Sequence, residues 1–345
     1  MSPSRHDDAR AAALASFIDS KLEGGAWTIA PASSDASFRR YFRVFLQTPC
    51  ALSRGAPTLI AMDAPPPQED CRPFVRVAGL LHEAGVHAPQ VLAEDLAHGF
   101  LLLGDLGDTT YLARLDDANA PALYLDAIDA LVRWQAASRE GVLAPYDEAL
   151  LARELALFPD WYVARHLGRT LSDAEQAGLQ AVFRAILDNN LAQPRVYVHR
   201  DYHSRNLMVC DPNPGVLDFQ DAVYGPVTYD LVSLLRDAYV AWDEERQLDW
   251  AIRYWERARR AGLPVAHDFA SFWRDFEWMG VQRQLKVLGI FARLWHRDGK
   301  AAYLADMPRV MVYLRSAARR YAALDPLTRL LDSLEARPAS GGYTF

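Results

Sequence analysis

The sequence predicts an α+β fold with two lobes, a small antiparallel β-rich N-lobe over residues 1–104 and a larger, mainly helical C-lobe over residues 105–345. Two patterns lead to this expectation. Short strand-like segments separated by turn residues fill most of residues 27–104. Beyond them, apolar residues recur at helical spacing, interrupted by one strand-rich insert at residues 195–219.

The N-lobe opens with an amphipathic helix over residues 9–22. Three strand-like segments follow, WTIAPA, FRRYFRVFL and TLIAMDA, with the turn residues SSDAS and TPCALSRGAP between them. A helix begins near Pro73 and ends at Gly85, because glycine is favoured just after a helix. VLAED and FLLLGDL then form a hairpin around a His-Gly turn. The predicted order is therefore β-β-β-α-β-β.

The C-lobe contains seven segments with helical spacing, at residues 121–138, 147–166, 173–191, 229–240, 244–261, 269–296 and 307–323. Ser172 and Glu175 fit a capping box at the start of the third. In the insert, VYVHRDY, NLMVC and GVLDF are typical of short buried strands. The final SGGYTF is expected to be a loose tail.

Composition excludes several classes of protein. The net charge of −7 and pI near 5.7 argue against a protein that binds nucleic acid or an anionic membrane. Three distant cysteines, Cys50, Cys71 and Cys210, favour neither a disulfide framework nor a zinc site. The N-terminus is not typical of a signal peptide, and no apolar run is long enough to span a bilayer. We therefore expect a cytoplasmic protein, a monomer, with a small-molecule partner.

The segment VYVHRDYHSRNLMV carries the chemistry. His199, Arg200 and Asp201, with Asn206 five residues after the aspartate, give the H-R-D-x-x-x-x-N spacing of a kinase catalytic loop. Asp218 follows at the end of a second apolar strand. A carboxylate can orient an acceptor hydroxyl and take its proton, and hard oxygen ligands can hold a metal ion on phosphates. The alternative is a solvated loop whose carboxylates cap turns, but the combined spacing favours phosphoryl transfer.

At these residues the chain resembles a known family. HRDYHSRN and VLDFQD resemble the aminoglycoside phosphotransferase/choline kinase-like branch of the protein-kinase-like fold. Three longer stretches are similar to the bacterial anomeric kinases that phosphorylate N-acetylmuramate and N-acetylglucosamine at C1 in cell-wall recycling: PGVLDFQDAVYGPVTYDLVSLLRDAY, ELALFPDWYVARHLG and WMGVQRQLKVLGIFARLWHRDGK. The resemblance implies a bilobal sugar kinase that uses ATP and Mg²⁺.

The resemblance also implies roles for single residues. Asp201 is the base or hydroxyl-orienting carboxylate, and Asn206 and Asp218 hold Mg²⁺. Asp230 fixes the catalytic loop through backbone hydrogen bonds or Arg200, or alternatively serves only as an N-cap.

One feature departs from the family. Kinases of this fold carry a lysine on the third strand, whereas this chain has Met62 near that place and no lysine between Lys21 and Lys286. Some other cation should meet the nucleotide phosphates. We favour Arg40 or Arg43, which strand alternation puts on opposite faces. They could equally be exposed arginines on an edge strand.

The rest of the nucleotide site is expected on both sides of these strands. Ser34 and Ser37, in the turn before the second strand, could cover the phosphates in place of a glycine-rich loop. Leu103, Asp105 and Leu106, where the fifth strand meets the linker, could present backbone groups to the base.

The acceptor pocket is expected in the helical lobe. Candidates on the lining helices are Glu154, Asp160, Trp161, Trp278, Arg283 and Lys286. On the catalytic loop, His203 and Arg205 could contact the γ-phosphate or the sugar. An aromatic face suits a pyranose ring, and a cation suits the lactyl carboxylate of N-acetylmuramate. Core or loop packing is the alternative role for each.

Two other functions remain open at this point. The acceptor could be an aminoglycoside or another small alcohol. The missing strand-three lysine also allows a catalytically inactive nucleotide-binding module, although Asp201, Asn206 and Asp218 are all present.

Overall fold

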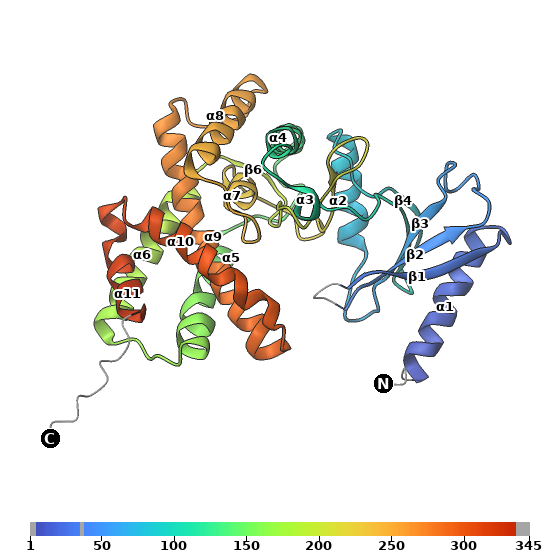
Figure 1. Ribbon diagram of the computed structural model, residues 1–345, viewed down its shortest axis with the longest axis horizontal. Helices are drawn as coiled ribbons and strands as arrows, with labels where there is room; N and C mark the ends of the chain where they lie inside the picture. Colours follow the sequence, from blue (N-terminus) through green and yellow to red (C-terminus); the bar gives the residue numbers. More distant parts are fainter. Residues whose placement is uncertain (1–4, 35–37, 336–345) are drawn as a thin grey trace. The chain divides into compact units, whose positions relative to one another are not determined.

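The computed structural model describes residues 5–34 and 38–335, and the chain divides into two compact units (Figure 1). The first comprises Met1–Thr110 and Asn206–Asp221, and the second comprises Tyr111–Arg205 and Ala222–Phe345. The predicted boundary at residue 104 lies six residues before Thr110, where the chain first leaves the first unit. The chain returns to the first unit at Asn206–Asp221, so Asn206 and Asp218 belong to it.

A five-stranded antiparallel sheet forms the centre of the first unit, with the strand order β1-β2-β3-β5-β4. The strands are β1 (Trp27–Ser34), β2 (Arg40–Leu46), β3 (Thr58–Asp63), β4 (Val91–Asp95) and β5 (Phe100–Gly104). Helix α2 (Arg72–Glu83) connects β3 to β4, which confirms the predicted order β-β-β-α-β-β. The short strands β7 (Leu207–Met208) and β8 (Gly215–Val216) pair with each other in the same unit.

Helix α1 (Arg5–Lys21) covers one face of this sheet (Figure 1). Its residues Leu14, Phe17 and Ile18 form a core cluster with side chains of three strands, Val44, Leu59, Ala61, Phe100 and Leu102. Because side chains alternate along a strand, Arg40 lies on the same face as Val44, whereas Arg43 lies on the opposite face with Met62. The predicted separation of the two arginines is confirmed.

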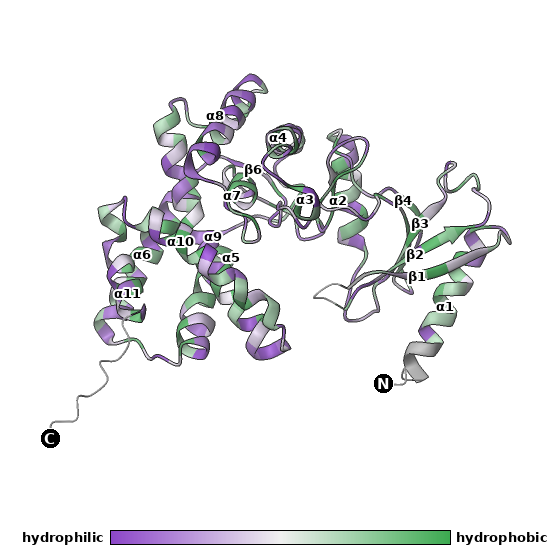
Figure 2. Cartoon of the chain, viewed as in Figure 1, coloured by the Kyte–Doolittle hydropathy of each residue, from purple (hydrophilic) through white to green (hydrophobic). Residues whose placement is uncertain are grey.

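The second unit is mainly helical. Its helices are α3 (Tyr111–Arg114), α4 (Ala120–Ala136), α5 (Glu148–Leu157), the π-helix η1 (Phe158–His166), α6 (Asp173–Ala192), α7 (Tyr229–Leu235), α8 (Glu244–Arg260), α9 (Phe269–Asp298), η2 (Ala301–Asp306), α10 (Met307–Ala318), η3 (Ala322–Leu324) and α11 (Asp325–Glu335). The strands β6 (Arg195–Val198) and β9 (Val223–Pro226) pair antiparallel. Helix α8 is largely hydrophilic (Figure 2). Helix α9 is buried along most of its length. In the described part of the chain, no helix has the length and apolar character to cross a bilayer.

Several element predictions need correction. The predicted helix 147–166 changes from α to π geometry at Phe158, beside Pro159. The predicted helix 229–240 ends at Leu235, because Arg236 leaves helical dihedrals and the Asp237 carboxylate accepts a hydrogen bond from the Tyr239 backbone. Helix 307–323 ends at Ala318, and α3, α11 and β9 were not predicted. The capping box of Ser172 and Glu175 is confirmed. The SGGYTF tail lies outside the described residues.

Candidate active site

Two carboxylates hold the catalytic loop, Asp230 in α7 and Asp237 just after that helix. Asp230 is fully buried and accepts hydrogen bonds from the backbone N–H groups of His199, at 2.6 Å, and Arg200, at 3.0 Å. Asp237 accepts from the backbone N–H of Ser204 at 2.8 Å. Asp230 thus holds the loop as predicted, and it is not an N-cap, because that position is Thr228. Burial raises the pKa of Asp230 to about 7 although both backbone donors act to lower it.

Asp201 lies in the segment that these bonds fix. Its own burial acts to raise its pKa, but Lys286, His203, Arg283 and Arg200 together outweigh burial and lower the pKa to about 2. Asp201 is therefore ionised at neutral pH and can accept a hydrogen bond from an alcohol.

Glu154 is the centre of a buried ion network that includes Arg200 of the catalytic loop. Its Oε1 lies 2.6 Å from Nη2 of Arg200 and 3.0 Å from Nζ of Lys286, and its other oxygen accepts from the Tyr146 hydroxyl. Nζ of Lys286 also donates to the Tyr229 hydroxyl at 2.9 Å. Burial acts to raise the pKa of Glu154, but the charges of Lys286 and Arg200 leave it lower than usual. The network places two cations next to Asp201 and balances them with one buried carboxylate.

The candidate metal ligands lie together in the first unit. Nδ2 of Asn206 is 3.3 Å from Oδ2 of Asp218, and Oδ1 of Asp218 accepts from Gln220 at 2.7 Å. Rotation of the Asn206 amide would turn its oxygen toward an ion held by the Asp218 carboxylate. One carboxylate and one carboxamide oxygen suit Mg²⁺, which takes its remaining ligands from phosphates and water. These residues therefore fit a magnesium ion.

Left-handed backbone occurs in both parts of the motif. Among the described residues, four that are not glycine have a positive φ, and two of them are Arg200, at 79°, and Asp218, at 62°. The left-handed region costs a residue with a side chain roughly 1–2 kcal/mol, which applies fully to Arg200 and less to an aspartate such as Asp218, whose short side chain can hydrogen-bond locally. Such strain concentrates at functional sites.

The predicted acceptor residues separate into two groups. His203, Arg205 and Arg283 lie around Asp201 and Tyr239: the Tyr239 ring is 5.3 Å from the His203 ring and 3.6 Å from the Arg205 guanidinium carbon. Burial lowers the pKa of His203, and its Nδ1 is buried without a hydrogen-bond partner within the described chain. Trp278 instead packs against Tyr321, with ring centroids 5.6 Å apart.

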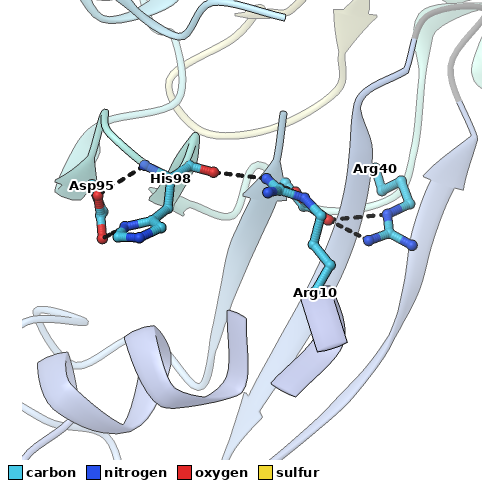
Figure 3. Close-up of polar contacts among 5 residues, drawn as sticks. Arg10, Arg40, Asp95 and His98 are labelled. Carbon is cyan, nitrogen blue, oxygen red and sulfur yellow. Dashed lines mark hydrogen bonds and ion pairs between the residues drawn. The ribbon is translucent and has the colours of Figure 1, made fainter. Parts of the chain in front are cut away.

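The predicted nucleotide residues are held by ion pairs. Arg43 binds Asp105 through Nε at 2.7 Å, and also the Gly107 carbonyl. Arg40 binds the fully buried Asp63, which Arg10 of α1 also binds while contacting the His98 carbonyl (Figure 3).

The remaining nucleotide candidates are apolar or lie in the turn after β1. Leu103 is buried and Leu106 is half-buried. Ser34 ends β1, and Ser37 lies outside the described residues.

Sequence reasoning missed Asp237 as a loop anchor. It lies two residues beyond the end of α7, in a turn, so helical spacing in the sequence carried no signal for its contact with the catalytic loop. A cavity of about 690 Å³ between α5, η1 and α6 was also unforeseen, and of the predicted acceptor residues its lining contains Asp160.

Comparison with known proteins identifies the family of the chain. Residues 28–264 match the phosphotransferase enzyme family. The chain is 53% identical over 340 residues to the N-acetylmuramate/N-acetylglucosamine kinase of Pseudomonas aeruginosa, covering 95% of this chain and 98% of that relative. It is 50% identical to the kinase of the same name from Neisseria meningitidis, covering 91% and 93%.

A solved structure shares the fold. ADP-bound aminoglycoside phosphotransferase APH(2'')-Ib has a TM-score of 0.56 at 13% identity, over 88% of this chain and 97% of that one. The expected protein-kinase-like fold is therefore confirmed. Together with the match over most of its length and the two curated relatives, this establishes that the chain belongs to the phosphotransferase enzyme family.

Proposed function

We propose that this phosphotransferase uses ATP and Mg²⁺ to phosphorylate the anomeric C1 hydroxyl of N-acetylmuramate and N-acetylglucosamine, a step of peptidoglycan recycling. The observation that carries the proposal is the 53% identity, over 95% of the chain, to a curated kinase named for both sugars. Family membership alone makes the chain a small-molecule phosphotransferase that acts on a hydroxyl. An ADP-bound protein of the same fold supports ATP as the donor.

Asp201 is the residue proposed to act on the acceptor. Its carboxylate accepts a hydrogen bond from the C1 hydroxyl and takes the proton as the bond to phosphorus forms. With a pKa of about 2, Asp201 is a weak base. Its main contribution is therefore to orient the hydroxyl, since a phosphoryl-transfer transition state with little nucleophile bonding needs late proton removal.

Asn206 and Asp218 would hold Mg²⁺, which when bound neutralises charge on the β- and γ-phosphates. The contact between their side chains at 3.3 Å supports this pairing. Gln220, which donates to Asp218, would keep the carboxylate oriented.

Arg283 and His203 are the residues we propose for sugar recognition. Both lie close enough to Asp201 for their charges to affect its pKa, and Nδ1 of His203 has no partner within the described chain. Lys286 is paired with Glu154 and donates to Tyr229, so we infer that it stabilises the negative charge of Asp201 and does not bind the sugar. Trp278 packs against Tyr321 and is left out of the proposed pocket.

The test is a phosphorylation assay with a panel of acceptors. Purified protein is incubated with Mg-ATP and N-acetylmuramate, N-acetylglucosamine or an aminoglycoside, and NMR locates the new phosphate. The proposal expects C1 phosphates on both sugars. Phosphorylation of only the aminoglycoside, or ATP binding with no transfer to any acceptor, would contradict it.

Variants then test the assigned residues. Asp201→Asn and Asp218→Asn should each lower kcat by roughly 10²–10⁴-fold without changing the unfolding midpoint. Asp211→Asn, an exposed carboxylate between the two motifs, is the matched control and should keep full activity. Normal turnover in both motif variants would refute the assignment.

A further inference from the structure

The structure narrows the choice of the cation that replaces the strand-three lysine. Met62 is fully buried on the sheet face away from α1, so the position itself offers no charge. Three arginines, Arg39, Arg40 and Arg43, lie in or next to β2, the strand that pairs with β3. Their partners differ, and those partners show where each guanidinium is directed.

Arg40 lies on the sheet face opposite to Met62. It lies on the α1 face, where Nε and Nη2 bind Oδ2 of Asp63 at 3.0 and 2.5 Å. Arg10 of α1 binds the other oxygen of Asp63 at 2.7 Å (Figure 3). Since Met62 faces the opposite side, Arg40 fastens α1 to the sheet and does not extend toward the lysine's place.

Arg43 lies on the correct face but is directed to the end of β5. Both of its bonds to Asp105, at 2.7 and 3.1 Å, and its bond to the Gly107 carbonyl, at 2.8 Å, tie it to the segment after β5. Its cross-strand neighbour is Ile60, two residues before Met62. Arg43 therefore orders the stretch expected to hold the base.

Arg39 pairs with Glu69, in the segment that leads into α2. Its Nε lies 3.0 Å from Oε2 of Glu69, and the other Glu69 oxygen accepts from the backbone N–H of Phe38 at 3.2 Å. The Arg39 and Glu69 side chains are only 12% and 11% exposed, so this is a shielded pair.

Helix α2 links this pair to the candidate metal site. Glu69 stands just before α2, and Phe74 of that helix packs on Phe219 with ring centroids 4.6 Å apart, next to Asp218 in the chain. Burial lowers the pKa of Arg39, but Tyr41, Glu69 and also Asp218 outweigh it, so the pKa lies above its usual value.

We propose that Arg39, oriented by Glu69, is the cation that binds the nucleotide phosphates beside Asp218, in place of a strand-three lysine. A guanidinium carries five N–H donors and can bind phosphate oxygens while one N–H stays on a carboxylate. Glu69 is the positioning residue, since it fixes the guanidinium without touching the nucleotide. The inference rests on the proposed function in one respect, that a nucleoside triphosphate is the donor.

The test measures nucleotide binding directly by calorimetry, with Mg-ATP and with adenosine. Arg39→Ala should weaken ATP binding by about tenfold or more and leave adenosine binding within about twofold. Arg39→Lys should recover part of the loss, and Glu69→Gln should weaken ATP binding less than Arg39→Ala does. Arg72→Ala, which removes a 72% exposed cation at the start of α2, is the control and should bind ATP like the wild type.

Different outcomes separate this inference from the proposed function. ATP binding by Arg39→Ala within about twofold of the wild type, in protein that unfolds at the wild-type temperature, overturns the role of Arg39. So does a loss of ATP affinity that appears in Arg43→Ala and not in Arg39→Ala. A wild type that binds ATP but phosphorylates no sugar overturns the proposed acceptor and leaves the Arg39 comparison intact.

Discussion

Removing the Glu154 carboxylate should destabilise the second unit strongly. The side chains of Glu154 and Lys286 are 6% and 7% exposed, and that of Arg200 is 20% exposed, so neither cation can easily turn to water. Breaking a buried ion pair by removing one partner costs about 3–5 kcal/mol, because the other charge stays buried and unpaired. For a unit of this size, each kcal/mol shifts the unfolding midpoint by roughly 2–4 °C. Glu154→Ala should therefore unfold about 6–20 °C below the wild type.

The assay is thermal unfolding followed by circular dichroism, with two comparison variants. Glu148→Ala removes another carboxylate of α5, but that side chain is 53% exposed and pairs with the exposed Arg184, so its cost should be below about 1 kcal/mol. The double variant Glu154→Gln with Lys286→Met removes one charge of each sign. It should lose less stability than the sum of its two single variants, with a coupling of roughly 0.5–3 kcal/mol.

The pH dependence of this effect has a defined direction. The pKa of Glu154 is lowered in the folded state, so its stabilisation is present above the unfolded pKa and is lost as the pH falls through the folded value. The midpoints of wild type and Glu154→Ala should therefore converge in acid. An Ala variant whose midpoint matches that of Glu148→Ala at neutral pH would refute the reasoning.

Three further predictions follow from the site and its support. Because burial raises the pKa of Asp230 to about 7, the folded state binds a proton that the unfolded state releases, so the free energy of unfolding should fall as the pH rises from about 4 to about 7. Urea titrations of Asp230→Asn should lack this part of the pH dependence. A variant whose free energy of unfolding changes with pH as steeply as that of the wild type would contradict the expectation. A Cβ at Gly289 of α9 would lie 2.4 Å from the Leu157 backbone, so Gly289→Ala should lower the free energy of unfolding in the same titrations by about 1–3 kcal/mol. A variant as stable as the wild type would show that α9 can shift to make room. Excess EDTA should abolish turnover and added Mg²⁺ should restore it, whereas the unfolding midpoint of the nucleotide-free protein should not change. Full turnover in EDTA would exclude a magnesium requirement.

Local patterns were enough to predict the strands of the five-stranded sheet. Alternating apolar residues located β2 and β3 and separated Arg40 from Arg43, because a strand turns each successive side chain to the other face. The spacing from Asp201 to Asn206 and Asp218 was likewise visible in the chain itself.

The unpredicted features depend on contacts between residues far apart in the sequence. Asp63 meets Arg10 across 53 positions, and Arg39 meets Glu69 across 30, and no local pattern reports which carboxylate an arginine reaches. The change to π geometry at Phe158 was also not predictable from local sequence, because the spacing of apolar residues does not distinguish an α-helix from a π-helix over one or two turns.

The left-handed backbone at Asp218 has a practical consequence for engineering. Glycine adopts φ near 62° freely, whereas aspartate, although better tolerated there than most residues, still bears part of the roughly 1–2 kcal/mol cost of this conformation. Laboratory evolution that selects only for heat resistance would therefore tend to accept glycine at this position and discard a proposed magnesium ligand. Directed evolution of this enzyme should screen each round for product formation as well as for survival on heating.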